Sequence, residues 1–216
     1  MENLLPIHSP FFLSGPDLDD TVSWAMLFGT DQPLVLEIGC GIGDFAVAMA
    51  QRHSDWNYIA LDYYNKGCLK TCRRAERFGL QNIRVVRDEA RAFISRCLPE
   101  QSLQAIFINC PDPWPKRRQR KRRLVNELFV NTLARYLRPG GDLFFTTDFS
   151  DYGTDVARMM PRQQGFENML APDLWCHDLQ DYPRTKYMLK FMAEGKQIYF
   201  VHYRRTVEPQ GRELHG

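Results

Sequence analysis

The residues best suited to chemistry lie in one short stretch, which reads Asn-Cys-Pro-Asp-Pro-Trp-Pro-Lys from position 109 to 116. Three prolines within five residues restrict the backbone to a few extended or turn conformations, so we expect a rigid loop. The loop holds a carboxylate, Asp112, and an aromatic side chain, Trp114. Residues 104–108, just before it, are apolar and β-branched, which predicts a buried strand. A loop at the end of such a strand is where α/β proteins bind their ligands.

A dense run of positive charge follows directly. Seven of the eight residues from Lys116 to Arg123 are Lys or Arg, and none is acidic. The net charge of the whole chain is only +2; removing these seven from the 28 basic residues leaves 21 against 26 acidic ones, a balance of −5. A local cationic patch on a mildly acidic body predicts one face for a polyanion. The alternative, a solvated helix start, is disfavoured because positive charge opposes the macrodipole at a helix N-terminus and repels itself.

A second candidate site is a glycine-rich turn after a strand. Residues 34–38 are apolar apart from Glu37, and Gly39, Gly41 and Gly43 follow before a helical pattern begins. Glycines at such a turn let the backbone approach a ligand closely. The spacing G-x-G-x-G differs from the dinucleotide fingerprint, and no Lys-Ser/Thr follows, so neither NAD nor a nucleoside triphosphate is favoured. A carboxylate inside a buried strand is costly unless it is paired or faces a cationic ligand.

Acidic residues recur where the predicted strands end. Asp62 ends the strand predicted over 57–62, Asp148 ends the one over 142–148, and Asp112 lies just past a third. Because parallel strands share one carboxyl edge, we expect these carboxylates to converge there. Asp62 is placed to accept both hydroxyls of an adenosine ribose, with an N-cap for the following helix as the alternative.

Asp88 and Glu89 follow another predicted strand, 82–86, and open a helix. Acids suit a helix N-terminus, and from this turn they could also recognise an adenine amino group. The glycines and acids together supply no basic residue for a pyrophosphate. This set of groups favours S-adenosylmethionine, which combines an adenosine with a sulfonium and an ammonium.

Strands and helices alternate along the chain, which predicts a doubly wound, Rossmann-like α/β sandwich with a mostly parallel sheet. We expect residues 1–30 to be an N-terminal extension or lid and residues 31–216 to be a single domain. The predicted elements are strands at 34–38, 57–62, 82–86, 104–109, 142–148 and 196–203, and helices at 44–51, 64–78, from 88, at 124–137, 152–160 and 185–190.

The composition fits a globular protein, with 44% hydrophobic and 25% charged residues among 216. Neither a signal peptide nor a membrane span is expected, so we expect a cytoplasmic protein without a membrane partner. The six cysteines show no C-x-x-C spacing and no neighbouring histidine that would complete a zinc site, so we expect free thiols and no metal. The sequence leaves open whether the protein is a monomer or a homodimer.

Taken together, these motifs resemble the bacterial tRNA (guanine-N7)-methyltransferase family. The resemblance runs in order from about residue 33 to residue 205, and D-P-W-P-K…K-R-R is its most specific part. It implies the class I methyltransferase fold with a final antiparallel strand, and methyl transfer from S-adenosylmethionine to a guanine N7 in the tRNA variable loop. The stretches that carry it are Glu37-Ile-Gly-Cys-Gly-Ile-Gly43, Asp62, Pro111-Asp-Pro-Trp-Pro-Lys116, Lys121-Arg-Arg123, Thr147-Asp148 and Thr185-Lys-Tyr187.

The resemblance also implies roles for individual residues. Those that would hold the cofactor are Glu37, Gly39, Gly41, Gly43, Asp62, Asp88, Glu89 and Asn109. Those that would face the guanosine and its phosphates are Asp112, Lys116, Arg117, Arg118, Asp148, Thr185, Tyr187 and Met188. Guanine N7 has a lone pair and no proton, so its methylation needs alignment and no general base. Asp112 is the predicted catalytic residue, because a carboxylate near the purine stabilises the positive charge that develops there.

Two positions depart from the family pattern. Met188 stands where the family has a glutamate expected to read guanine donors, which implies altered RNA specificity, weaker activity or a diverged paralogue. The turn after the third strand reads Asp88-Glu89-Ala90 where the family has Asp-Ala, so Glu89 is expected to take the cofactor role. Trp114 either stacks on the purine or braces its loop. The alternative functions are methylation of a different RNA and RNA binding without catalysis.

Overall fold

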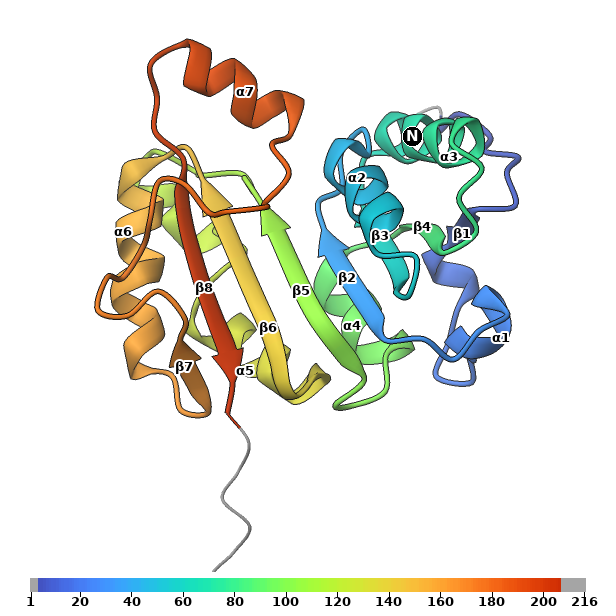
Figure 1. Ribbon diagram of the computed structural model, residues 1–216, viewed down its shortest axis with the longest axis horizontal. Coiled ribbons are helices and arrows are strands. Elements are labelled where there is room, and N and C mark those ends of the chain that lie inside the picture. Colours follow the sequence, from blue (N-terminus) through green and yellow to red (C-terminus); the bar gives the residue numbers. More distant parts are fainter. Residues whose placement is uncertain (1–3, 207–216) are drawn as a thin grey trace, which may run out of the picture.

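The computed structural model describes residues 4–206. The predicted domain runs to residue 216, and its last ten residues, like residues 1–3, lie outside the described residues. Within the described range one sheet has the strand order β1-β4-β3-β2-β5-β6-β8-β7 (Figure 1). Its strands are β1 (Phe12–Ser14), β2 (Leu34–Ile38), β3 (Asn57–Asp62), β4 (Ile83–Arg87), β5 (Leu103–Asn109), β6 (Leu137–Thr147), β7 (Phe166–Asn168) and β8 (Tyr199–Arg205).

Helices cover both faces of this sheet, with α2 and α3 in front of it and α4 and α5 behind it in the view of Figure 1. The α-helices are α1 (Trp24–Phe28), α2 (Asp44–Arg52), α3 (Asn65–Arg77), α4 (Ala90–Cys97), α5 (Glu127–Tyr136), α6 (Ser150–Met159) and α7 (Lys186–Ala193). Short 3₁₀ helices are η1 (Gly15–Asp17), η2 (Arg117–Arg122) and η3 (Met160–Arg162).

The pairing of the strands confirms the predicted fold class. Strands β1 to β6 pair in parallel, whereas β8 is antiparallel to both β6 and β7. The strand β2 lies at the centre and is buried along its whole length, as expected of a continuous apolar run in a parallel sheet. Strands β3 and β5 lie on opposite sides of β2, so the order of the strands reverses at β2. Ligands of such sheets bind at this switch point, outside the carboxyl end of the strand.

The pleat of β2 decides what each of its side chains meets. Leu36 and Ile38 join the core beneath α4 and α5, whereas Val35 joins the core beneath α2 and α3. Because side chains alternate along a strand, Glu37 lies on the same face as Val35. The one acidic residue of the strand therefore lies under the glycine turn and α2.

The N-terminal segment is part of the sheet. β1 adds an edge strand beside β4, with Phe12 opposite Val85. Residues 4–30 line neither of the two cavities described below. A strand of three residues is too short to show a period-two pattern, which is why the sequence did not predict it.

Two further boundaries differ from the prediction. Strand β6 begins at Leu137 and not at residue 142, because residues 137–141, which include Pro-Gly-Gly, already belong to the strand. The pairing with β5 has a register shift at this point. Helix α5 begins only at Glu127, where the Asn126 side chain accepts a hydrogen bond from the Phe129 amide. The basic run before it forms η2, so its charges do not continue into α5.

Candidate active site

Two adjoining cavities open at the carboxyl ends of the central strands. The first, here the Glu37 cavity, has a volume of about 670 Å³ and lies between the glycine turn and α7. The second, here the Asp62 cavity, has a volume of about 580 Å³ and lies between the ends of β3, β4 and β5. Both cavities lie at the switch point of the sheet. The residues that line both are Gly39, Asn109, Cys110 and Asp112.

The glycine turn presents bare backbone to these cavities. Gly39 and Gly41 have φ angles of +83° and +56°, and a Cβ built on either would have no atom within 4 Å. Gly43 differs, because a Cβ there would lie 2.7 Å from the Thr71 side chain, and Gly43 lines neither cavity. Its position therefore supports close packing of α2 against α3 and does not support the predicted contact with a cofactor.

The Asp62 carboxylate ties the ends of two elements together. Oδ2 accepts a hydrogen bond of 2.6 Å from the Gly41 amide, and Oδ1 accepts one of 2.7 Å from the Tyr64 amide at the start of α3. Asp62 is not the N-cap of α3, because that position is held by Tyr64, whose amide the Asp62 carboxylate accepts. The Asp62 side chain lines the Asp62 cavity, as the predicted contact with a ribose requires. Each carboxylate oxygen keeps a further lone pair for a hydroxyl of a ligand.

Glu37 is the most buried charged side chain of the site, with 1% of its surface exposed. Burial raises the pKa of Glu37 to about 8, although hydrogen bonds from Asn109 Nδ2 (3.2 Å) and the Tyr58 hydroxyl (3.3 Å) act in the opposite direction. A cationic group beside this carboxyl would favour its charged form and offset the cost of burial. Glu37 is thus suited to an ammonium ligand.

Asn109 connects Glu37 to the segment before α7. Its Oδ1 accepts hydrogen bonds from the Tyr182 hydroxyl at 2.7 Å and from Thr146 Oγ1 at 3.1 Å. Asn109 is therefore held by β2, β6 and the segment before α7 at once, and its place on the wall shared by the two cavities agrees with the predicted contact to the cofactor.

Asp88 and Glu89 both line the Asp62 cavity, but each already has a structural partner. Glu89 caps α4 by accepting a hydrogen bond of 2.9 Å from the Ala92 amide. Asp88 forms an ion pair with Arg96 and accepts the Glu89 amide at 2.8 Å. Glu89 therefore caps the helix, as the alternative predicted, and both carboxylates still line the cavity.

Asp112 lies where the two cavities meet. It is exposed, and it forms no hydrogen bond or ion pair with any other residue between 4 and 206. The loop that holds it contains three prolines, which restrict its backbone, and the flanking Cys110 and Trp114 both have positive φ angles, of 45° and 43°. An unpaired carboxylate at this junction is available to a substrate.

Arg123 anchors that loop. Only 4% of the residue is exposed; its Nε donates to the Pro113 carbonyl at 2.9 Å, and its guanidinium pairs with Asp151 at 2.7 Å and Asp155 at 2.5 Å. The Arg122 guanidinium lies 4.9 Å from the centre of the Trp114 ring. Trp114 lines the Asp62 cavity and not the Glu37 cavity, so its place favours the loop-bracing alternative.

Apart from Arg122, which packs on Trp114, the basic run divides into two kinds of residue. Arg120 and Arg123 are neutralised by the acids of α6. The others that the resemblance assigned to phosphates are exposed and make no ion pair within the described part of the chain: Lys116, Arg117 and Arg118, together with Lys121.

Helix α7 forms the outer wall of the Glu37 cavity. Thr185 Oγ1 caps it by accepting a hydrogen bond of 3.0 Å from the Met188 amide, and both Thr185 and Tyr187 line the cavity. Partial burial, together with the charge of nearby Asp148, raises the pKa of the Tyr187 phenol. These two residues lie where the sequence predicted substrate contacts.

Met188 and Asp148 do not line either cavity. The Met188 side chain is completely buried against Ile198 and Phe200, so its position does not support the predicted contact with the guanosine. The helical period explains this, because the residue after Tyr187 faces a different side of α7. Asp148 pairs instead with Lys196 at 3.3 Å, beside Tyr187.

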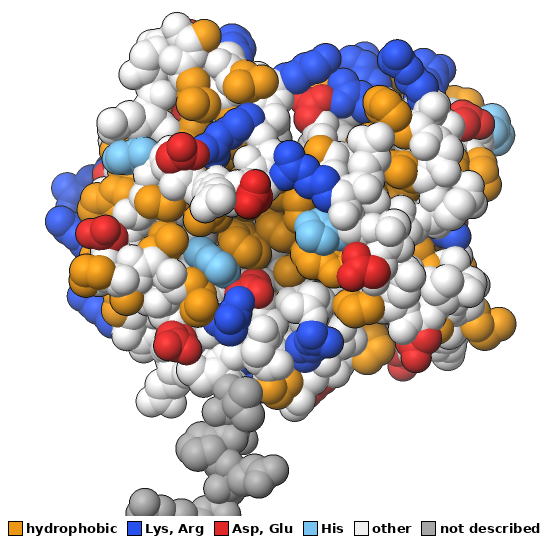
Figure 2. Space-filling model, in the orientation of Figure 1, with side chains coloured by type: hydrophobic (Ala, Val, Ile, Leu, Met, Phe, Trp, Pro, Cys, Tyr) orange, Lys and Arg blue, Asp and Glu red, His pale blue; other side chains and the backbone are white. Residues whose placement is uncertain are grey.

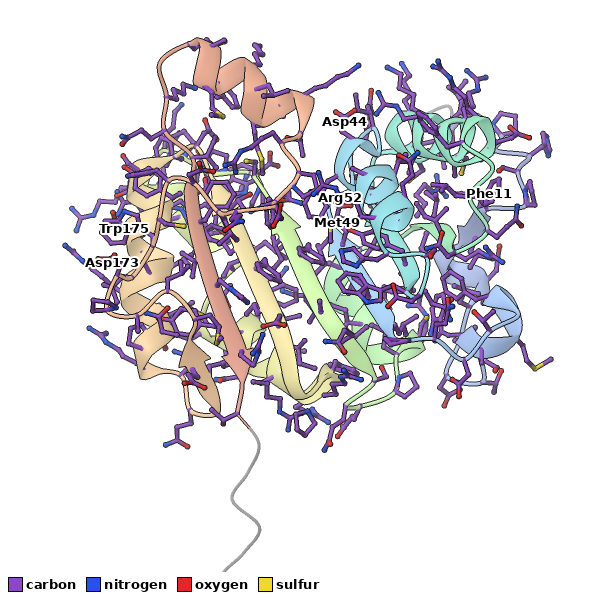
Figure 3. The ribbon with its side chains drawn as sticks, viewed as in Figure 1. Phe11, Asp44, Met49, Arg52, Asp173 and Trp175 are labelled. Carbon is purple, nitrogen blue, oxygen red and sulfur yellow. The ribbon has the colours of Figure 1, made fainter. Side chains whose placement is uncertain are left out.

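Several site residues were not predicted from the sequence. Figure 3 shows Asp44 on α2 at the end nearest α7, with Arg52 further along the same helix. Asp44 Oδ2 accepts the Lys186 amide at 3.2 Å, and Arg52 donates to the Asp181 carbonyl at 2.5 Å. Helix α2 thus fixes both ends of the segment that leads into α7. Tyr182, which binds Asn109, was not predicted either. An aromatic residue within a polar, proline-rich stretch was the one feature of the sequence that could have indicated this contact.

Among the helices between residues 4 and 206, none is both long enough and apolar enough to cross a membrane. The same residues contain no group of three His, Cys, Asp or Glu side chains placed to hold a metal ion.

Comparison with known proteins agrees with this geometry. A family model described as a putative methyltransferase matches residues 31–201. The crystal structure of the 16S rRNA methyltransferase KamB matches with a TM-score of 0.61 at 13% identity, over 82% of this chain and 89% of that one. The antibiotic-resistance methyltransferase Kmr matches with a TM-score of 0.58 at 18% identity, over 88% and 95%. Fold and site together define a class I methyltransferase.

Two relatives are more similar in sequence. The tRNA (guanine-N(7)-)-methyltransferase of Geobacter metallireducens is 59% identical over 96% of this chain and 99% of its own length. The protein of the same name from Syntrophotalea carbinolica is 49% identical over 95% and 88%. The chain belongs to the family of bacterial tRNA (guanine-N7)-methyltransferases.

Proposed function

We infer that the protein transfers the methyl group of S-adenosylmethionine to N7 of a guanine in tRNA, in the variable loop. The observation that carries this inference is the exposed, unpaired Asp112 at the junction of the two cavities, next to a row of unpaired cations. The names of relatives that align over nearly the whole chain support the same reaction.

The residues present fit the cofactor. S-adenosylmethionine supplies an electrophilic methyl group on a sulfonium. The acids of the Asp62 cavity can accept the hydroxyls and the amino group of an adenosine. The bare glycine turn and the buried carboxyl of Glu37 suit the charged amino-acid end. We therefore assign the adenosine to the Asp62 cavity and the methionine part to the wall shared with the Glu37 cavity.

Catalysis then rests on position and charge. Guanine N7 already carries a lone pair, so no side chain has to remove a proton. Thr185, the N-cap of α7, Tyr187 on α7 and Asp112 all line the Glu37 cavity. We therefore propose that the purine binds between α7 and the Asp112 loop, which would align it for the reaction. Positive charge develops on the purine as N7 is methylated, and the Asp112 carboxylate stabilises that charge and can accept hydrogen bonds from guanine donors.

RNA binding falls to the unpaired cations of the basic run, which contact phosphates without reading bases. The target guanine has to leave its stack to reach Asp112, so we expect it to be flipped out or in an open loop. All six cysteines are free thiols, as suits the reducing cytoplasm where we place the protein.

The test is transfer of a labelled methyl group from S-adenosylmethionine to tRNA that lacks 7-methylguanosine, with the product nucleoside identified and mapped. The expected product is 7-methylguanosine in the variable loop. Label in a different RNA and none in tRNA would favour an enzyme that methylates another RNA. Such an enzyme should still bind S-adenosylmethionine. Failure to bind millimolar S-adenosylmethionine by calorimetry would favour an RNA-binding protein without catalysis.

A further inference from the structure

Helix α3 carries a row of cations that the site described above does not use. Lys66, Lys70, Arg73 and Arg77 follow the spacing i, i+4, i+7 and i+11, which places them on one stripe of the helix surface. All four are exposed, and none makes an ion pair with another residue in the described part of the chain. Figure 2 shows Lys and Arg side chains gathered over α3, at the upper right of the view.

This row has a fixed place relative to the active site. Gly67 packs so closely on the glycine turn that a Cβ there would lie 2.4 Å from the Gly41 carbonyl oxygen. Tyr64, the residue before α3, lines the Glu37 cavity. At 1.5 Å per residue, the row extends about 16 Å from Lys66 to Arg77. The cations therefore begin beside the cavity and lead away from it.

Stability of the helix explains only Arg77 in this row, because Arg77 lies in the last turn, where the helix dipole favours a cation. Like charges three and four residues apart destabilise a helix, and Glu76 is the only acidic residue of α3. Arg74 shows the contrast, since it lies off this stripe and pairs with Asp44. An unpaired cationic stripe is complementary to a polyanion.

Exposed aromatic rings lie at both ends of the same helix. Tyr63 and Tyr64 precede it and are 74% and 56% exposed, and Phe78 follows it at 49%. Aromatic side chains beside a cationic stripe suit a nucleic acid, because unpaired bases stack on them while phosphates meet the cations.

We propose that α3 is a second backbone-binding surface for the RNA substrate, opposite the basic run at 116–122 across the cavities. This rests on the proposed function and extends it. Phosphate contacts fix the register of an RNA without reading its sequence. Two such surfaces on different elements hold the RNA at two points, which determines the nucleotide that reaches Asp112.

The test compares two variants that each lose three exposed cations, none of which makes an ion pair with another residue from 4 to 206. One is Lys70→Gln, Arg73→Gln, Arg77→Gln; the matched control is Arg138→Gln, Arg158→Gln, Arg162→Gln, none of which lines either cavity. At about 0.15 M salt the α3 variant should bind tRNA about tenfold more weakly, with a salt slope smaller by two to three. The control should stay within about twofold of the wild type.

Further readouts separate this surface from the chemistry. The α3 variant should raise the KM for tRNA and leave both kcat at saturating tRNA and the affinity for S-adenosylmethionine unchanged. Arg73→Lys with Arg77→Lys keeps the charge and should keep the affinity, which shows that charge and not folding is measured.

Equal tRNA affinity and salt slope in the α3 variant and its control would overturn the proposal, while methylation by the wild type would leave the proposed function intact. Wild-type protein that binds tRNA without methylating it would instead count against the proposed function. Binding to anionic lipid vesicles that depends on the α3 cations, with tRNA binding unchanged, would assign the surface to a membrane and overturn the proposal.

Discussion

The Tyr182 hydroxyl donates a hydrogen bond of 2.7 Å to Asn109 Oδ1, which joins the segment before α7 to the wall shared by both cavities. The Tyr182 ring is inserted among aromatic side chains from α2, β5, β6 and β8. Asn109 in turn donates to Glu37. Two hydrogen bonds in series thus link the segment that leads into α7 to the buried carboxyl of the site.

Tyr182→Phe keeps the ring and removes only this contact. We expect the free energy of unfolding to fall by about 1 kcal/mol, the typical value of one buried hydrogen bond. Because α7 is then less firmly positioned, kcat/KM for tRNA should fall by about tenfold. Denaturant unfolding and steady-state kinetics measure the two effects.

Tyr203→Phe is the matched control. The Tyr203 hydroxyl is buried and has no hydrogen-bond partner among the described residues, so its removal should not lower stability and should leave the rate unchanged. If both variants kept wild-type kinetics, the Tyr182–Asn109 contact would have no part in positioning α7.

Asp112 is predicted to act on the transition state. Asp112→Ala should lower kcat by about 100-fold or more, the scale of one lost electrostatic contact in an active site. Its affinity for tRNA and for S-adenosylmethionine should stay within about twofold, because phosphates and the cofactor have their own contacts. Single-turnover rates and equilibrium binding separate these effects. A loss of RNA affinity as large as the loss of rate would assign Asp112 to RNA binding.

The two kinds of cation in the basic run should respond differently to alanine. Arg123→Ala leaves Asp151 and Asp155 without their buried partner, and should lower the free energy of unfolding by about 2–3 kcal/mol, since these acids are partly exposed. Arg117→Ala with Arg118→Ala should leave stability within about 0.5 kcal/mol. It should instead weaken tRNA binding and reduce its salt slope by about two. An unchanged slope would exclude phosphate contacts at these positions.

Glu37 should make stability depend on pH. Burial raises the pKa of Glu37 in the folded protein from its ordinary value of 4.5 to about 8, so the folded state holds a proton that the unfolded state loses. The contribution is fully present below pH 4.5 and is lost as pH rises to about 8. Glu37→Gln cannot titrate, so the melting temperature of the variant should rise relative to the wild type by several degrees between pH 5 and pH 9. Parallel curves for the two proteins would contradict this.

The sequence predicted the sheet and its ligand edge because both depend on local patterns. The bounds of β2 and β3 match their predicted ranges, since continuous apolar runs ended by Gly39 and Asp62 leave few alternatives. Asp62, Asn109 and Asp112 lie at that edge because parallel strands must place them there.

What the sequence could not predict depends on contacts between distant residues. Gly43 has the same local signal as Gly41, and only its approach to Thr71 on α3 distinguishes the two. Met188 lies next to Tyr187 in the chain, but tertiary packing against Ile198 and Phe200 turns it away from the cavity. Arg123 is indistinguishable from its neighbours in the run until α6 brings its two acids alongside.

The most direct test of the account replaces one atom of the substrate. A tRNA that carries 7-deazaguanine in place of guanine at the mapped position has a C–H group where N7 was. Single-turnover methyl transfer is measured with this tRNA and with the matching guanine tRNA, after equal binding of both is verified. We predict label on the guanine tRNA and none on the other. Equal label on both would show that guanine N7 is not the methylated atom.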